Sequence, residues 1–183
     1  TVSPILAVPY DNTIYELGIE FYEYKLFVIE RQVSNGYISN YVEVPTSEQG
    51  GVYSSIAFML VDSSYIHVIW EDSVNPYWIT RISRATLEVL ETVNISDRLT
   101  EYTSVINSVY DLDPLTVCTD ETYLYFMPPD WTTLDETTVY YKMKCDDYTD
   151  VTAIPTPEAH YGLNLYALVT DGDYLYGLDS DNA

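Results

Sequence analysis

The sequence of 183 residues predicts an all-β fold, and three observations support this. Aromatic residues make up 15% of the chain, and 20 residues are Tyr, which is enriched in strands. No segment carries a sustained apolar stripe with the 3.6-residue period of an amphipathic helix. One short pattern, an apolar run followed by Asp and then by an aromatic–aliphatic run, recurs four times.

The composition is typical of a folded and very acidic protein. Asp and Glu number 29 against 7 Lys and Arg, which gives a formal charge of −22. Such a charge is also found in disordered chains, but these lack apolar residues to bury, whereas 47% of this sequence is hydrophobic. The length fits one domain of ordinary size.

The recurring pattern occupies four segments of the chain, which are Ala7–Tyr15, Met59–His67, Val117–Tyr125 and Leu168–Tyr176. Their Asp residues are Asp11, Asp62, Asp120 and Asp171, at spacings of 51, 58 and 51 residues. Each copy predicts a tight hairpin, because an Asp side chain that accepts hydrogen bonds from backbone N–H groups two residues on stabilises a turn. The Asp171-Gly172 dipeptide is a strong hairpin signal. We therefore interpret the four Asp as turn residues and assign them no catalytic role.

Two further strands follow the hairpin in each of the first three repeats. They are predicted at Tyr24–Arg31 and Tyr37–Val44, at Tyr77–Ile82 and Leu87–Val93, and at Thr138–Cys145 and Thr149–Ile154. The turn around Asn35-Gly36 joins the first of these pairs. In the fourth repeat the sequence ends shortly after the strand Tyr174–Leu178. Four antiparallel strands in about 50 residues correspond to one blade of a β-propeller.

Two segments resemble the blades of the β-propeller superfamily. The segment Tyr77–Leu90, with a strand, a short turn ending in Thr and the run Leu-Glu-Val-Leu, is similar to the outer half of a blade. Thr170–Asp179 is similar to the inner half. The resemblance covers most of the chain at the level of the fold, and the Trp-Asp dipeptide of WD repeats is absent, so it indicates no subfamily.

The repeats define one all-β region over residues 1–183, with blades at about 5–45, 56–96 and 115–155 and a partial blade at 165–183. Propellers close with about 4–8 blades, so three and a half leave an open edge. Three explanations are compatible with this number. The sequence is part of a longer protein, or two copies complete a seven-bladed ring, or the strands form a β-sandwich instead.

The charge limits the partners. Nucleic-acid binding needs clustered Lys and Arg, and here the few basic residues are scattered among four times as many acids. No apolar run approaches the ~20 residues that span a bilayer. The acidic character and a first residue other than Met favour a processed protein outside the cell, or on a cell or virion surface. Asn94-Ile95-Ser96 matches the sequon for N-glycosylation, which applies only to a protein outside the cell or on a surface.

The two cysteines, Cys118 and Cys145, match no zinc pattern. In a blade, one strand would separate them, which places them ~9–10 Å apart, too far for a disulfide. The blade therefore predicts free thiols, whereas a sandwich still allows a bridge.

Acidic loops and loop aromatics are the candidate binding residues. Calcium prefers oxygen ligands from flexible, Asp-rich loops, and the candidate metal ligands are Asp171, Asp173, Asp179 and Asp181. The candidate recognition residues, which suit sugars or protein surfaces, are Trp70, Tyr77, Trp78 and Trp131. The alternatives are turn formation for the acids and packing for the aromatics. His67 stands where later repeats have Tyr, so we interpret it as a strand residue.

The sequence thus favours a non-enzymatic binding or structural module of the β-propeller type in an extracellular or virion surface assembly. Its partners would be proteins, further copies of itself or glycans. Two other classes remain open. One is a carbohydrate-active enzyme whose paired carboxylates the sequence does not single out. The other is a filament or coat subunit joined by calcium or by donated strands.

Overall fold

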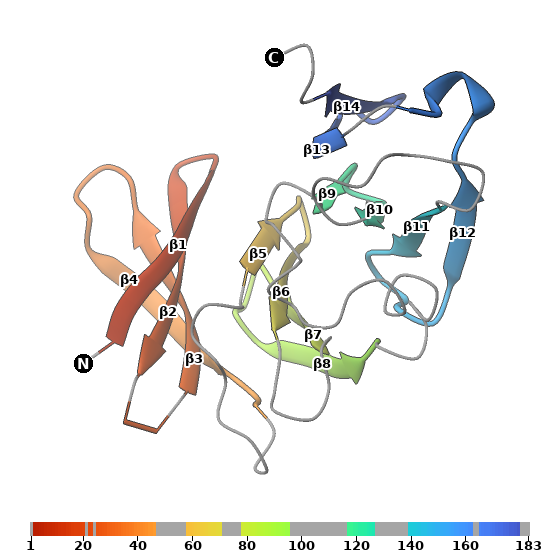
Figure 1. Cartoon of the computed structure of the whole chain (residues 1–183). Helices are drawn as coiled ribbons and strands as arrows, with labels where there is room; N and C mark the ends of the chain where they lie inside the picture. Colours follow the sequence, from red (N-terminus) through yellow and green to blue (C-terminus); the bar gives the residue numbers. More distant parts are fainter. Residues whose placement is uncertain are drawn as a thin grey trace. The chain divides into compact units, whose positions relative to one another are not determined.

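The computed structural model describes residues 2–20, 22–23, 25–46, 58–70, 78–95, 117–126, 139–162 and 165–179. Within these ranges the chain consists of antiparallel β-sheets and one 3-10 helical turn, Glu158–His160 (Figure 1). The predicted all-β class is therefore confirmed. The chain divides into two compact units, Thr1–Ser96 and Asp97–Ala183, and the division falls between the second and third predicted repeats. None of the described helices has the length and apolar character needed to cross a membrane.

The first sheet contains β1 (Val2–Tyr10), β2 (Thr13–Glu20), β3 (Lys25–Gln32) and β4 (Ile38–Val44), paired in chain order. A two-residue turn joins β1 to β2, since Tyr10 pairs with Thr13. Asp11 in this turn has a φ of 53°, a left-handed conformation that Asp tolerates better than most residues. The predicted Asn35-Gly36 turn is confirmed, with Gly36 at a φ of 70°.

The second sheet contains β5 (Phe58–Val61), β6 (Tyr65–Trp70), β7 (Trp78–Ser83) and β8 (Val89–Asn94), again in chain order. Residues 66–70 of β6 are all buried, as expected for an inner strand covered on both faces. Among the described residues of the first unit, both sheets contribute to a shared hydrophobic core. Leu17 and Val28 from the first sheet and Ile66 and Trp70 from the second lie in it.

The second unit contains a four-stranded sheet and a two-stranded sheet. The larger one has the order β12 (Val151–Pro155), β11 (Val139–Lys144), β10 (Tyr123–Phe126) and β9 (Val117–Thr119). The smaller one pairs β13 (Leu165–Thr170) with β14 (Leu175–Asp179). Leu168 of β13 packs in a small core with Cys118, Tyr125 and Tyr140.

The predicted strands agree with the observed ones to within two residues, and one difference has a clear cause. The strand predicted to begin at Leu87 begins at Val89. Leu87 has a φ of 54°, and its N–H donates to the carbonyl oxygen of Ser83 at 2.8 Å. Leu87 therefore belongs to the turn between β7 and β8, and its side chain is still buried in the core.

Both cysteines are buried thiols that form no disulfide, as the blade geometry predicted. Cys118 lies in β9 and Cys145 directly follows β11, so β10 separates them in the sheet. Burial, with the charge of Asp120, raises the pKa of the Cys118 thiol to about 12. A thiol with this pKa is protonated at neutral pH and is a poor nucleophile.

Candidate ligand-binding site

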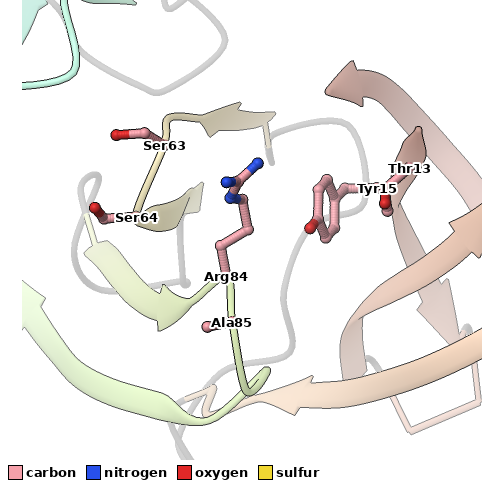
Figure 2. Close-up of a pocket in the computed structure, with 6 residues that line it drawn as sticks. All are labelled: Thr13, Tyr15, Ser63, Ser64, Arg84 and Ala85. Atoms are coloured by element: carbon pink, nitrogen blue, oxygen red, sulfur yellow. The ribbon is translucent and has the colours of Figure 1, made fainter. Parts of the chain in front are cut away.

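An open pocket with a volume of about 470 Å³ lies in the first unit. It is lined by Thr13 and Tyr15 of β2, Ser63 and Ser64 of the β5–β6 turn, and Arg84 and Ala85 of the β7–β8 turn. Figure 2 shows the Arg84 side chain extending between the β5–β6 turn and Tyr15. The lining therefore combines four hydroxyl-bearing side chains with one guanidinium group.

Asp62 holds the β5–β6 turn that carries the two serines. Its Oδ1 accepts hydrogen bonds from the N–H groups of Ser64 at 2.7 Å and Tyr65 at 2.6 Å. Its Oδ2 lies 2.8 Å from Nε2 of His67, and both side chains are buried. The predicted turn role of Asp62 is thus confirmed, and His67 is confirmed as a strand residue.

The same arrangement recurs in the second unit. Asp120 accepts hydrogen bonds from the N–H groups two and three residues on, at 2.9 and 2.7 Å, and from the Tyr125 hydroxyl at 2.7 Å. Asp171 does so at 3.0, 2.9 and 2.7 Å, with Tyr176 as the hydroxyl donor. His67, Tyr125 and Tyr176 occupy the same position, five residues after the Asp. The first repeat differs, because the residue five positions after Asp11 is Glu16, which forms an ion pair with Arg31 at 2.9 Å.

The environment of Asp62 sets its ionisation. Burial by itself would raise the pKa of this carboxyl group. The hydrogen bond and charge interaction with His67, together with the N–H groups of Ser64 and Tyr65, outweigh burial and hold the pKa below its ordinary value. The carboxylate is therefore ionised at neutral pH.

This lowered pKa predicts a loss of stability in acid. A carboxyl group whose pKa is lower in the folded state stabilises the fold above its unfolded-state pKa of ~4, and this contribution disappears as the pH falls through the folded-state value. The difference in unfolding free energy between the wild type and Asp62→Asn should therefore be constant above about pH 5 and shrink below about pH 4. Urea unfolding at pH 7, 5 and 3 measures it. A difference that grows in acid would contradict the assignment.

Arg84 connects the two turns of the pocket. Its N–H donates to the carbonyl oxygen of Ser64 at 2.9 Å, which fixes the β7–β8 turn against the β5–β6 turn. Its guanidinium carbon lies 4.2 Å from the centre of the Tyr10 ring, a cation–π distance. Its Nη1 lies 3.4 Å from Oδ2 of Asp11, a long contact to a side chain that is 74% exposed. The guanidinium is thus positioned but only weakly neutralised.

The β7–β8 turn has its own supports. Its ends are joined by a hydrogen bond from the N–H of Ser83 to the carbonyl oxygen of Glu88 at 2.8 Å. The hydroxyl of Ser83 accepts from the N–H of Thr86 at 3.3 Å. These bonds do not involve the Arg84 side chain, so replacing that side chain should leave the turn intact.

Tyr15 provides a neutral hydroxyl beside the arginine. Burial, with a contribution from the charge of Glu30, raises the pKa of this phenol, while Arg84 acts in the opposite direction. The net pKa lies above the ordinary value, so the hydroxyl keeps its proton at neutral pH and can donate a hydrogen bond.

The structure corrects one predicted recognition residue. Trp70 is not in an exposed loop: it is the last residue of β6 and is 1% exposed. Its indole N–H donates to Oγ1 of Thr80 at 3.1 Å, and its ring stacks on Trp78 with centres 5.4 Å apart. Trp70 is buried because removing its large apolar surface from water stabilises the folded state. Trp78 is half-buried, and Tyr77 and Trp131 lie outside the described residues.

The predicted metal ligands are only partly described. Asp171 forms the turn, as the alternative interpretation predicted, and its oxygens accept the three hydrogen bonds given above. Asp173 is exposed, and Asp179 is the last residue of β14. The Asp179 side chain and Asp181 lie outside what the structure describes. Calcium binding at these four residues stays a prediction.

The pocket itself was not predicted. Its residues come from three separate parts of the sequence, and Arg84 lies in the short turn of the segment Tyr77–Leu90. One signal was available: Arg84 is a basic residue in a turn of a chain with few basic residues. Compared with protein-family models and with curated proteins, the chain matches none.

Proposed function

We propose that this chain is a non-enzymatic binding module of the β-propeller type, located outside the cell or on a cell or virion surface. Support for this architecture comes from three antiparallel sheets whose four strands pair in chain order, and from the Asp turn that three of the repeats share. The acidic composition and the sequon at Asn94 support the location.

The pocket around Arg84 is the proposed binding site. The observation that carries this proposal is a guanidinium group held by a turn in a pocket otherwise lined mainly by hydroxyl groups. A guanidinium binds a carboxylate through two parallel hydrogen bonds, and Ser, Thr and Tyr hydroxyls suit the hydroxyl groups of a sugar. The ligand class is therefore an acidic sugar, such as a uronic acid within a glycan. The six lining residues include no carboxylate pair of the kind used in glycoside hydrolysis, which favours binding over cleavage.

Two substitutions should change the affinity in opposite directions. Arg84→Gln removes the cation and should weaken the binding of glucuronic acid about 10-fold, the effect of losing ~1.4 kcal/mol of charge-assisted hydrogen bonding. Asp11→Asn removes the competing carboxylate and should strengthen binding about 2- to 5-fold, because a like charge near the site costs up to ~1 kcal/mol in water. NMR titration of the full chain with glucuronic acid measures both.

The controls separate local from general charge effects. Arg31→Gln changes the net charge as Arg84→Gln does, but Arg31 is bound to Glu16 on the first sheet and does not line the pocket. The Arg31→Gln protein should bind glucuronic acid with the same affinity as the wild type. As a second control, the wild type should bind glucose more weakly than glucuronic acid. Equal affinities in the Arg84→Gln and Arg31→Gln proteins, or no binding of uronic acids by the wild type, would refute the proposed site.

A further inference from the structure

A carboxylate lies next to the part of the Arg84 pocket that the first sheet forms. In the pairing of β2 with β3, Tyr15 lies directly opposite Glu30. Directly opposed residues of an antiparallel pair project from the same face of the sheet, with Cβ atoms about 5 Å apart. Because Tyr15 lines the pocket, the half-buried side chain of Glu30 stands beside the pocket, on the same face of the sheet.

The charge of Glu30 is not neutralised by an ion pair with any residue that the structure describes. The next residue of the strand, Arg31, projects from the opposite face, because side chains alternate along a strand. There its Nε and Nη2 donate to the two carboxylate oxygens of Glu16, each at 2.9 Å. The negative charge of Glu30 is therefore available to a ligand.

Opposite charges stand on the two sides of the pocket hydroxyls. The Arg84 guanidinium lies over the ring of Tyr10, at the end of β1. Tyr10 pairs with Thr13, two residues before Tyr15, so these side chains share one face of the sheet. Strands β1, β2 and β3 are neighbours in this order, and two strand spacings amount to about 10 Å. This face thus presents a cation at β1, hydroxyls at β2 and the carboxylate of Glu30 at β3.

Both charges act on the Tyr15 hydroxyl between them. Burial is the main reason why the pKa of this phenol lies above its ordinary value. The charge of Glu30 raises the pKa further, whereas that of Arg84 lowers it. The pocket is therefore electrostatically two-sided, and a purely negative ligand would be attracted at one side and repelled at the other.

We propose that the ligand of this pocket is a zwitterionic sugar acid, whose carboxylate binds Arg84 and whose ammonium group faces Glu30. The assignment rests on the proposed function, because it needs an acidic sugar at Arg84, and it adds a second charged group to that sugar. A sugar ring that carries an acid at one end and a free amine at the other separates the two charges, as the three strands do. Glucosaminuronic acid is the simplest sugar of this kind.

Three sugars test the assignment in NMR titrations of the full chain at about pH 6, where amines are protonated and carboxylates ionised. They are glucuronic acid, glucosaminuronic acid and N-acetylglucosaminuronic acid. The wild type should bind glucosaminuronic acid about 2- to 5-fold more tightly than glucuronic acid, the usual size of a partly exposed ion pair. The acetylated sugar should lose this advantage, because acetylation removes the positive charge.

Two variants with the same change in net charge locate the preference. Glu30→Gln should bind glucosaminuronic acid and glucuronic acid equally well. The matched control is Glu43→Gln, in the same sheet. Glu43 pairs with Phe27, projects from the face opposite to Glu30 and contacts Lys25 at 3.6 Å. This control should keep the wild-type preference.

The outcomes separate this assignment from the pocket itself. Suppose that glucuronic acid binds and that Arg84→Gln weakens it. An amino sugar that then binds no more tightly, or a preference that persists in Glu30→Gln, would overturn the zwitterionic ligand and leave the acidic one. A preference lost equally in Glu30→Gln and Glu43→Gln would reflect only the net charge of the chain and would overturn it too. If none of the three sugars binds, the proposed site itself fails.

Discussion

The variant Asp62→Ala is expected to lower the unfolding free energy of the first unit by about 3–5 kcal/mol, because it removes three hydrogen bonds to one buried carboxylate, each worth ~1.5 kcal/mol. The substitution leaves His67 buried without its 2.8 Å carboxylate partner. It also removes the acceptor for the N–H groups of Ser64 and Tyr65, which then lack their acceptor in a turn beside the core. Urea unfolding of the full chain, followed by far-UV circular dichroism, measures the effect.

The second unit supplies a matched control for this prediction. Asp171 makes the same set of hydrogen bonds, but it is exposed, so water can replace the lost acceptor. Asp171→Ala should therefore lower the unfolding free energy by much less than Asp62→Ala does. Hydrogen exchange separates the two units, because only Asp62→Ala should accelerate exchange in β5 and β6. Similar losses in both variants would show that burial does not determine the strength of this turn.

The second large effect is expected for Trp70→Ala, at about 3–5 kcal/mol of unfolding free energy, the range for aromatic-to-alanine changes in a core. The substitution removes the indole that stacks on Trp78 and packs among the apolar residues of both sheets of the first unit. The cavity that it leaves adds to the cost, since a sheet relaxes only partially around it. Urea unfolding with amide exchange over β5–β8 measures the loss.

One variant compares a partial loss of the Trp70 contacts with their complete loss, and a surface variant serves as the control. Trp70→Phe keeps one aromatic ring but loses part of the indole volume and the donor to Thr80, whose hydroxyl still bonds to Thr92 at 3.0 Å, so about 1–2 kcal/mol should be lost. Tyr37→Ala on the surface should change the unfolding free energy by no more than about 0.5 kcal/mol. A Trp70→Ala protein as stable as Tyr37→Ala would contradict the core position of Trp70.

Local features were predicted well because they depend on residues close together in the sequence. An Asp that accepts hydrogen bonds from N–H groups two and three residues on needs only a short segment, so the turns at Asp62, Asp120 and Asp171 were visible as a pattern. The substitution of His67 for a tyrosine followed from the same alignment of repeats. The absence of a disulfide between Cys118 and Cys145 could also be predicted, because strand order in a simple antiparallel sheet repeats the chain order.

Other features depended on contacts between separate repeats. Trp70 was predicted to be in a loop because polar residues follow it, but its place at the end of an inner strand buries it. In the first Asp turn two residues separate the paired residues Tyr10 and Thr13, whereas four separate the paired ends of the other three turns. The first repeat also has an ion pair between Glu16 and Arg31 in place of an Asp–aromatic pair. A one-residue change in the pairing of two strands changes which side chains share a face of the sheet. The sequence pattern alone does not determine this pairing.

The sequence by itself determined the all-β class and the turns at Asp62, Asp120 and Asp171, because hydrophobic alternation and Asp turn chemistry act over a few residues. Only the tertiary structure decided where these turns meet. The pocket exists because the N–H of Arg84 bonds to Ser64, twenty residues earlier in the chain, and because β2 of the other sheet lies alongside. Such contacts depend on the packing of one sheet on another, which is set by the summed shape of many side chains and not by any local pattern.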